Sequence, residues 1–444
     1  MYDYLKEFTK DKNVCILGFG MEGKSTFKAL SEHCKCKSIT VCDKKEIDGS
    51  EFSCDFVCGE DYQKNLDNYD IVFKSPGIVL EKDINDYKST ITSEMEVFTK
   101  IYANQIIGIT GTKGKSTTSS LIFHIINSVN ENSLFAGNIG IPVFDIVPKI
   151  NNDTIIVCEM SCHQLEYMTC SPHISVFLNV FEEHLDHYKT MERYTSAKKN
   201  IYLHQNKNDI LICNKNLLPQ ENNIENKIIT VSDNDENSDI FICDGIVKSK
   251  SGFYVIPVEK ISLLGKHNHY NIGIAHTVCK IVGISEKDFT NALVSFKTLH
   301  HRLEYIGEKD GIKFFDDSIS TASETAIEAI KSVPLLSTII IGGMDRGIDY
   351  SNLIDFLSKN DIENIILMEH SGKRIYDEIS KKDDFRKKER IIFAEHLNDA
   401  VNIAKRVTPK GRSCVLSPAA ASYGIFKNFE ERGNAFKELV FGNF

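Results

Sequence analysis

The 444-residue sequence lacks several features that would assign it to common protein classes. No apolar run approaches the ~20 residues that a membrane-spanning helix requires, and the opening stretch MYDYLKEFTKDKN has no apolar segment of the kind found in a secretory signal. Basic residues are not in excess, because the formal net charge is -10, which argues against a general nucleic-acid binder. These absences predict a cytoplasmic protein without a membrane span and without a nucleic-acid partner.

Cysteine is present but without an ordered pattern. The thirteen cysteines are odd in number, scattered, and form no pair of C-x-x-C clusters. Neither structural zinc nor a disulfide framework is therefore expected in so long a chain, and a reducing compartment fits best.

What the sequence does contain is typical of a large globular chain. Hydrophobic residues make up 42% and charged residues 26%, and at roughly 150 residues per domain the length suggests about three domains. Strand-like apolar runs alternate with helical stretches, which predicts an α/β fold with mostly parallel sheets. The predicted strands cover 14–17, 39–41, 71–73, 106–109, 155–157, 175–178, 210–212, 338–341, 365–368 and 413–416. The Asn- and Asp-rich stretch 220–260 is interpreted as a β-rich excursion or a variable loop.

The tetrapeptide GKST occurs twice, at 23–26 and at 114–117. The first copy satisfies the phosphate-loop pattern G-x-x-x-x-G-K-[ST] through Gly18 and Gly23. The second copy fails the same pattern, because Ile109 stands where the leading glycine should be. Which copy binds ATP must therefore be decided by the residues around each loop.

The first loop also matches a different nucleotide-binding pattern. With Gly20 it reads G-x-G-x-x-G after a predicted strand, and Asp43 ends the next strand about twenty residues on, as in dinucleotide-binding folds. ATP hydrolysis would need a second acid at a neighbouring strand end, whereas Asp43 is followed by Lys44 and Lys45. We expect this loop to bind a nucleotide diphosphate, with a plain strand–helix turn and ATP hydrolysis as the alternatives.

The second loop has the chemical partners that the first one lacks. Its backbone N–H groups and the helix N-terminus would cradle phosphate, Lys115 would reach the β/γ oxygens, and Ser116 or Thr117 would face a metal ion. Glu159 ends a predicted strand downstream, where a second metal contact is needed. The second copy is therefore predicted to be the ATP loop.

Two further residues, His184 and Lys198, would each be an ordinary surface residue more often than not. They lie, however, in an ordered set of motifs that resembles the Mur ligase family and runs through nearly the whole chain. The matching segments are GITGTKGKSTT, GNIG, EMSCHQLE, LNVFEEHLDHY, YTSAKKNIY, LLGKHNHYN, HHRLE, DDS and SPAAASYGIFKNFEERG. Within the family, the resemblance is to the members that add glutamate.

The resemblance implies three domains, with N- and C-terminal Rossmann-like sheets flanking a central P-loop ATPase domain. Residues 1–100 would bind the UDP-substrate, 101–298 would bind ATP, and 299–444 would bind the incoming amino acid. The implied reaction joins D-glutamate to UDP-N-acetylmuramoyl-L-alanine in peptidoglycan precursor synthesis. The alanyl carboxylate would attack the γ-phosphate of ATP, and the amine of glutamate would displace the resulting acyl phosphate. Mg²⁺ at two sites and cationic side chains would offset the repulsion between the two anions, and we expect a monomer.

The resemblance also implies the site residues, position by position. The catalytic residues would be Lys115, Glu159, His184 and Lys198. The ATP-binding residues would be Gly111, Thr112, Lys113, Gly114, Lys115, Ser116, Thr117, Asn268, Asn271, Arg302 and Asp317. The UDP-substrate would contact Gly20, Met21, Glu22, Asp43, Lys44, Lys45, Ser75, Gly77, Asn138 and His184. The glutamate would contact Thr321, Arg346, Ser422 and Phe429. The Mg²⁺ ligands would be Ser116, Glu159, His184 and Lys198.

Lys198 is expected as a carbamate in this family. An ammonium group cannot ligate a cation, whereas a carbamate is an oxygen donor of the kind that Mg²⁺ prefers.

The third predicted domain departs from the family's usual pattern. The segment that usually reads Asp-Ser-Lys-Ala-Thr-Asn has Ile319 and Ala322 in place of the lysine and the asparagine. Arg346 stands where a lysine commonly binds the glutamate side chain, which replaces a point donor with a planar fork. The pocket suits an acidic amino acid, and ligation of L-glutamate is the near alternative. An NAD-dependent oxidoreductase is a remote alternative, because it leaves the second loop and Glu159 without a role. An inactive homologue is a further alternative, but it would not need Lys198.

Overall fold

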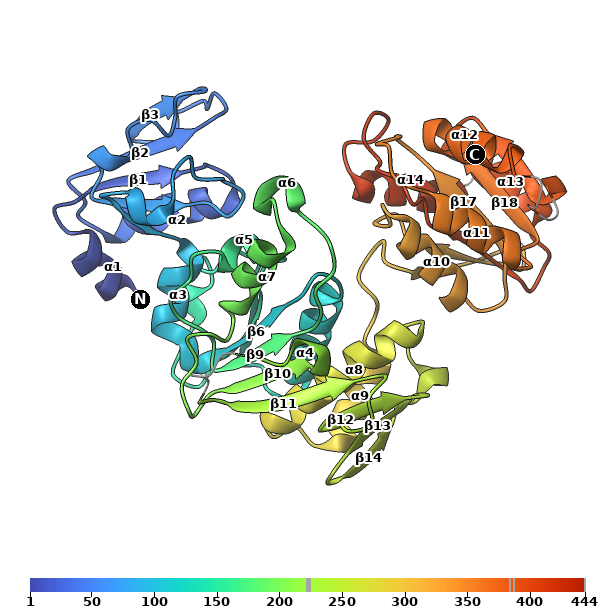
Figure 1. The fold of residues 1–444 in the computed structure, drawn as a ribbon, viewed down its shortest axis with the longest axis horizontal. Helices are drawn as coiled ribbons and strands as arrows, with labels where there is room; N and C mark the ends of the chain where they lie inside the picture. The colour runs from blue at the N-terminus through green and yellow to red at the C-terminus, as the bar shows by residue number, and fades with distance from the viewer. Residues whose placement is uncertain (221–224, 383–384, 386–387, 443–444) are drawn as a thin grey trace. The chain divides into compact units, whose positions relative to one another are not determined.

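The computed structural model describes residues 1–220, 225–382, 385 and 388–442. Within these residues the strands form three sheets, each with helices packed against it (Figure 1). The predicted α/β fold with three sheet-containing domains is confirmed. By internal packing the chain divides into two units, Met1–Ile256 with Tyr270–Leu293 and Pro257–His269 with Val294–Phe444.

The first sheet has the strand order β3-β2-β1-β4-β5, and all neighbouring strands run parallel. Its strands are β1 (Asn13–Leu17), β2 (Ser38–Asp43), β3 (Asp55–Cys58), β4 (Ile71–Lys74) and β5 (Thr90–Thr92). Its helices are α1 (Tyr2–Thr9), α2 (Met21–His33) and α3 (Glu94–Tyr102). The chain crosses from one side of β1 to the other, so the loops after β1 and β4 open beside each other, as ligand-binding loops do in such sheets.

The second sheet, also in the first unit, has the order β14-β13-β12-β11-β10-β9-β6-β8-β7. Its parallel strands are β6 (Ile106–Thr110), β7 (Ser133–Gly137), β8 (Ile155–Glu159), β9 (Ile174–Phe177), β10 (Ile210–Asn214), β11 (Lys227–Ser232) and β12 (Ile240–Cys243). The antiparallel strands β13 (Ile246–Ser249) and β14 (Gly252–Val255) extend it. Its helices are α4 (Lys115–Val129), α5 (Cys162–Leu165), α6 (Leu185–Tyr188), α7 (Met191–Lys199), α8 (Lys266–Ile281) and α9 (Glu286–Ser295). Because β8 and β9 flank β6, the segments that follow these three strands meet at one edge of the sheet.

The third sheet, in the second unit, has the order β15-β16-β20-β17-β18-β19. Its strands are β15 (Glu304–Lys309), β16 (Ile312–Asp316), β17 (Leu336–Gly342), β18 (Asn364–Met368), β19 (Ile391–Ala394) and β20 (Ser413–Leu416), and β15 is antiparallel to β16. Its helices are α10 (Ser323–Ser332), α11 (Ser351–Lys359), α12 (Glu369–Ser380), α13 (Leu397–Val407) and α14 (Phe429–Phe441). The ends of β16 and β20 lie next to each other.

The core follows from simple periodicity. Strand β6 is buried along its whole length, as expected for a parallel strand that is covered on both faces. Helix α4 buries Leu121, Ile122, Ile125 and Ile126, and this spacing places them on one face against the sheet. The buried faces of such elements position the loops at the strand ends.

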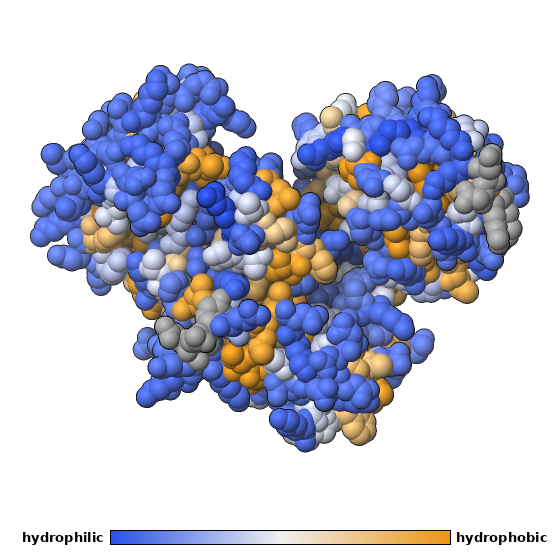
Figure 2. Space-filling view, in the orientation of Figure 1, coloured by the Kyte–Doolittle hydropathy of each residue, from blue (hydrophilic) through white to orange (hydrophobic). Residues whose placement is uncertain are grey.

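The ten predicted strands all fall on observed strands, although the run 175–178 extends one residue past β9. Between 225 and 260 the expected β-rich excursion is present as β11 to β14, while 221–224 lie outside the described residues. Among the described residues, none of the helices has the length and apolar character needed to cross a membrane. The face drawn in Figure 2 is mostly hydrophilic.

Candidate active site

The loop after β6 has the geometry of a phosphate cradle. Gly114 caps helix α4 with φ +85°, a conformation that L side chains rarely adopt. A Cβ at Gly114 would also lie 2.9 Å from Oδ1 of Asn271, so this asparagine packs directly against the loop. Asn271 is buried and accepts a hydrogen bond from Thr118 Oγ1 at 3.2 Å. The loop therefore needs a glycine at this position, and Asn271 supports it from α8.

A residue that the sequence reasoning missed fixes the same loop. Asn179, which follows β9, accepts hydrogen bonds from the N–H groups of Thr112 (3.1 Å) and Lys113 (2.8 Å). Its side-chain amide donates to the Lys113 carbonyl at 2.9 Å. Only the neighbouring position of β9 and β6 in the sheet reveals this role, since Asn179 lies more than sixty residues from the loop.

Two lysines converge on one backbone oxygen of this loop. Lys115 Nζ donates to the carbonyls of Gly111 and Thr112, both at 2.9 Å, and Lys198 Nζ donates to the Gly111 carbonyl at 2.8 Å. Lys198 is 1% exposed. Its burial, together with the positive charge of Lys115, lowers the pKa of Lys198 to about 8. The predicted catalytic lysines therefore lie together at the phosphate loop.

Glu159, the last residue of β8, presents a carboxylate with one uncommitted oxygen. It is 1% exposed, and its Oε1 accepts a hydrogen bond from Asn138 Nδ2 at 2.7 Å. Among the described residues, no group donates to its buried Oε2. A buried charged oxygen without a partner is costly, and a hard cation such as Mg²⁺ would satisfy it. The free oxygen of Glu159 thus fits the predicted metal ion. The Asn138–Glu159 hydrogen bond joins a predicted substrate residue to a predicted metal ligand.

His184 lies just before α6 in the left-handed conformation, with φ +58° and a side chain 42% exposed. Its ring centroid is 6.0 Å from that of Tyr194. Tyr194 Oη is hydrogen-bonded to Thr112 Oγ1 at 3.0 Å, and the Lys198 ammonium lies 4.7 Å from the Tyr194 ring centroid. Tyr194 therefore links His184, Lys198 and the phosphate loop. The sequence reasoning missed it, although it precedes Lys198 by four residues on the same helix face.

The remaining predicted residues of this loop differ in burial. Thr117 is buried, Ser116 is half-buried and accepts a hydrogen bond from Ser119 Oγ at its carbonyl (3.3 Å), and Lys113 is exposed.

The first GKST copy is built differently. The Asp43 carboxylate accepts hydrogen bonds from the N–H groups of Phe19 (2.7 Å) and Lys45 (2.8 Å), so it holds the glycine loop itself. Gly18 has φ +91°, and a Cβ at Gly23 would lie 2.1 Å from the Gly18 carbonyl oxygen. These glycines allow the close approach of strand, loop and helix that the G-x-G-x-x-G pattern predicts.

The serine of this first copy is hydrogen-bonded to carboxyl groups that lie outside the loop. Ser25 is buried, and its Oγ is 3.2 Å from Glu94 Oε1 and 3.1 Å from Asp145 Oδ1. Thr26 donates to Glu94 at 3.3 Å, and Lys24 is exposed. Burial raises the pKa of Glu94 well above its usual value. Ser25 is thus committed to the buried Glu94 carboxyl group and the exposed Asp145, which agrees with the interpretation of this loop as something other than an ATP site.

The other predicted substrate residues surround the glycine loop. Ser75 Oγ donates to the Gly18 carbonyl at 2.8 Å, and Lys44 forms an exposed ion pair with Glu60 at 3.0 Å. Glu22 accepts a hydrogen bond from Gln164 Nε2 at 2.6 Å, a contact across 142 positions that the sequence did not predict. The exposed members of this group are Gly20, Met21, Lys44, Lys45 and Gly77.

In the second unit, Asp317 follows β16 and is buried. Its carboxylate accepts hydrogen bonds from the Leu303 N–H at 3.2 Å and from Ser417 Oγ at 2.8 Å. Burial raises the pKa of Asp317 to about 7. Arg302 lies next to Leu303 and is half-buried, and Asn268 donates to the Leu264 carbonyl at 2.7 Å.

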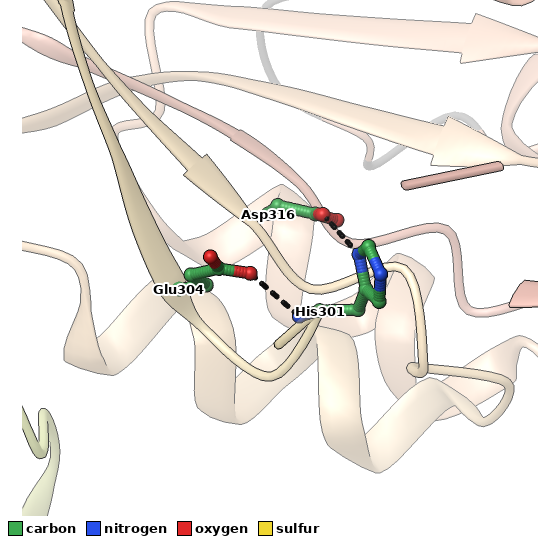
Figure 3. Close-up of side chains that lie close together, drawn as sticks. All are labelled: His301, Glu304 and Asp316. Carbon is green, nitrogen blue, oxygen red and sulfur yellow. Dashed lines mark hydrogen bonds and ion pairs between the residues drawn. The ribbon is translucent and has the colours of Figure 1, made fainter. Parts of the chain in front are cut away.

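A hydrogen-bonded cluster beside Arg302 was not predicted (Figure 3). His301 Nδ1 lies 2.6 Å from Asp316 Oδ2, and the His301 N–H donates to Glu304 Oε2 at 2.8 Å. Ligand atoms of His301, Glu304 and Asp316 lie within 4.8 Å of one another. The Lys437 ammonium, however, is 2.8 Å from Glu304 Oε2 and already supplies a cation there. The cluster is therefore a hydrogen-bonded support for the loop that carries Arg302.

The four predicted glutamate contacts also lie in the second unit. Ser422 is buried, Thr321 and Arg346 are exposed, and the Phe429 ring lies 6.2 Å from that of His301. A residue that was missed, Arg432, is 1% exposed and donates to the carbonyls of Ser318 (2.8 Å) and Ala420 (2.9 Å). The pocket itself stays a prediction.

Comparison with known proteins agrees with this arrangement. The Mur ligase middle domain family matches residues 109–279. A UDP-N-acetylmuramoylalanine–D-glutamate ligase of Clostridium botulinum strain 657 is 30% identical over 465 residues, covering 99% of this chain and 98% of its own. The enzyme of the same name from Clostridium kluyveri is 31% identical over 469 residues, with the same coverage of both chains. A solved structure of MurF ligase from Thermotoga maritima in complex with ADP shares the fold, with a TM-score of 0.58 and 17% identity over 98% of this chain and 96% of its own.

Fold, phosphate loop and relatives together define an ATP-dependent ligase of peptidoglycan-precursor synthesis. The chain belongs to the Mur ligase family, because relatives at this level of identity match it over almost its full length.

Proposed function

We propose that this enzyme joins D-glutamate to UDP-N-acetylmuramoyl-L-alanine through an acyl-phosphate intermediate. The observation that carries the proposal is the buried Glu159 carboxylate, which has one uncommitted oxygen and one oxygen bonded to Asn138. Its strand neighbours the strand that leads into the phosphate loop of Lys115. The names of the relatives with 30–31% identity support the choice of substrates.

The phosphate loop would bring the γ-phosphate and the alanyl carboxylate together. Lys115 would steady the β/γ oxygens, and the N–H groups of the loop would bind phosphate oxygens. Two anions repel each other, so the reaction needs cations that act where charge develops. Mg²⁺ would supply that charge when bound, and Ser116, Glu159 and His184 would hold it at two sites together with Lys198.

Lys198 would serve the metal as a carbamate. Its side chain is buried among the phosphate loop and Tyr194, where a second ammonium beside Lys115 is poorly placed. Carbamylation joins the neutral amine to CO₂ with loss of a proton, which converts a cation into an oxygen donor. The lowered pKa of Lys198 increases the share of neutral amine that this step requires.

The other predicted residues would complete substrate binding. The glycine loop at Gly18–Gly23, with Ser75 and Gly77, would bind the UDP diphosphate, and Asn138 would contact the muramoyl group. Asn268, Asn271, Arg302 and Asp317 would bind the nucleotide, and Thr321, Arg346, Ser422 and Phe429 would bind glutamate. The domain boundaries near residues 100 and 298 belong to this proposal, as does a monomeric state.

L-Glutamate is the second candidate for the amino acid. It is favoured by Ile319 and Ala322, which depart from the family's usual lysine and asparagine. The oxidoreductase alternative has no comparable support now that the family is known.

The acyl-phosphate route has a direct chemical test. Hydroxylamine attacks an acyl phosphate to give a hydroxamate and free phosphate. Incubation with ATP, Mg²⁺, UDP-N-acetylmuramoyl-L-alanine and hydroxylamine, without glutamate, should therefore yield the alanyl hydroxamate and equal amounts of ADP. Ligase activity without any hydroxamate would argue for another route.

A further inference from the structure

Lys74, at the end of β4, is a buried lysine outside the proposed catalytic set. Its side chain is 4% exposed. The ammonium donates to the carbonyls of Ser75 at 3.4 Å and Pro76 at 3.2 Å, the first two residues of the Ser-Pro-Gly turn. Ser75 Oγ in turn donates to the Gly18 carbonyl. Lys74 therefore holds the turn that lies against the glycine loop.

The same ammonium reaches a segment of the second sheet domain. Lys74 Nζ lies 3.8 Å from Glu166 Oε2 and 5.4 Å from the ring centroid of Tyr167. Glu166 directly follows α5, and Gln164 of that helix donates to Glu22 at 2.6 Å. Two independent contacts thus join the α5 segment to the substrate-binding loops of the first sheet.

Glu166 continues the connection toward the predicted metal ligands. Its two carboxylate oxygens lie 3.2 and 3.4 Å from His187 Nε2. The His187 ring centroid is 4.5 Å from that of His163, which lies 4.9 Å from that of His184. The Glu166 carbonyl also accepts a hydrogen bond from Asn200 Nδ2 at 3.1 Å, two positions after Lys198. One glutamate therefore contacts the α6 segment next to His184 and the residues that follow α7.

Because this pair is largely buried, the loss of one partner costs more free energy than it would in a surface ion pair. Lys74 and Glu166 side chains are 4% and 16% exposed. A buried charge that loses its partner is uncompensated, so removing either member strongly disfavours the paired arrangement. Burial lowers the pKa of Lys74 to about 8, and the charges of Glu166 and Glu22 oppose that shift. The contacts are therefore sensitive to the relative position of the two segments that they join.

We propose that Lys74 and Glu166 are positioning residues that fix the Ser-Pro-Gly turn relative to the segment that carries His184, just before α6. In this role they set the reach between the diphosphate of the bound UDP-substrate and the carboxylate that is phosphorylated. The inference rests on the proposed function, and it adds a second connection beside the Gln164–Glu22 hydrogen bond.

The test uses Lys74→Met, Glu166→Gln and the double variant that combines them. Lys74→Arg, which keeps the positive charge, is the conservative variant. Lys64→Met is the matched control, because Lys64 is an exposed lysine of the same sheet domain and is paired with the exposed Asp61. Turnover would be measured against UDP-N-acetylmuramoyl-L-alanine and against ATP, with binding of the UDP-substrate measured by calorimetry. Unfolding midpoints would show whether each variant is folded.

Lys74→Met and Glu166→Gln should each lower kcat/KM for the UDP-substrate by about tenfold or more while the KM for ATP changes less than about twofold. The double variant should be no worse than the poorer single variant, since both remove one connection, and Lys74→Arg should restore most of the loss. A KM for ATP that rises as much as kcat/KM for the UDP-substrate falls, additive losses, or an unchanged kcat/KM in folded variants would overturn the inference. If Lys74→Met does not fold, Glu166→Gln and Lys74→Arg decide the matter by the same criteria.

Failure of the proposed function and failure of the Lys74–Glu166 connection give different results. If wild type and Lys64→Met neither bind nor convert the UDP-substrate, the proposed function is wrong and the inference falls with it. If both are active and the Lys74 and Glu166 variants match them, the inference alone is wrong.

Discussion

At the scale of single residues, the central contact of the site is the Gly111 carbonyl, which accepts hydrogen bonds from both Lys115 and Lys198. Two ammonium groups at one oxygen repel each other, and the buried one has the less favourable position. Glu159, with its uncommitted Oε2, supplies the opposite charge at the end of the neighbouring strand. The site is therefore suited to receive a metal ion and phosphate, and the proposed carbamate would turn Lys198 into an oxygen donor.

Replacing Lys198 with alanine should nearly abolish turnover while binding of the UDP-substrate stays within several-fold, because in the proposed mechanism the lysine serves the metal and not the uridine. Kinetics and calorimetry check the two halves of this expectation. Arg193→Ala, an exposed change on the same helix, is the control and should be active. Full wild-type activity in bicarbonate-depleted buffer would contradict the carbamate.

Arg346 carries a second expectation at this scale. Arg346→Ala should raise the KM for glutamate far more than the KM for ATP, because a guanidinium pairs with the side-chain carboxylate of the amino acid. Arg346→Lys should retain part of the glutamate affinity. Steady-state kinetics with each substrate varied in turn provides the measurement, and equal effects on both KM values would remove Arg346 from the glutamate pocket.

At the scale of elements, the two copies of the GKST tetrapeptide lie in different surroundings. In α4 it follows β6, whose neighbours β8 and β9 deliver Glu159 and Asn179 to the loop. In α2 the serine instead faces Glu94 at the start of α3 and Asp145. Which side chains are delivered to a loop depends on strand order, so the short motif could not decide between the two copies without the downstream residues.

Glu94 predicts a pH dependence of stability. Its pKa is raised in the folded state, whereas an unfolded glutamate titrates at about 4.3. The protonated group therefore contributes stability fully below that pH, and the contribution is lost as pH rises through the folded-state pKa. Glu94→Gln keeps an uncharged side chain of the same shape, so its unfolding midpoint should gain on wild type as pH rises.

Thermal unfolding of wild type and Glu94→Gln between weakly acidic and weakly alkaline pH tests this expectation. Glu7→Gln, an exposed change in α1, is the control and should follow wild type at every pH. A difference between Glu94→Gln and wild type that does not vary with pH would show that Glu94 is ionised in the folded protein.

At the scale of the whole molecule, the sequence predicted the strands that are buried on both faces and missed several that are short or alternating. β6 and β20 read as continuous apolar runs and are buried throughout, whereas β3 and β15 alternate between exposed and half-buried residues. Central parallel strands can be predicted from their apolar composition, whereas edge strands cannot.

The candidate site divides in the same way. Residues in dense motifs, such as Lys115 and Glu159, were predicted, while Asn179, Gln164 and Glu166 were not. Their roles arise from contacts across sheet neighbours or between sheet domains, as in the Gln164–Glu22 hydrogen bond. No local pattern encodes such a contact, because it depends on how distant segments are brought together.

A side-by-side product assay with D- and L-glutamate tests the central claim most directly. Purified enzyme, ATP, Mg²⁺ and UDP-N-acetylmuramoyl-L-alanine would be incubated with each isomer. Mass spectrometry would identify the product, and its amount would be compared with the amount of ADP released. The account predicts a product heavier by one glutamyl residue with D-glutamate, one ADP per product, and little product with L-glutamate. Product with L-glutamate alone would assign the other stereochemistry, and no product with either isomer would contradict the proposed function.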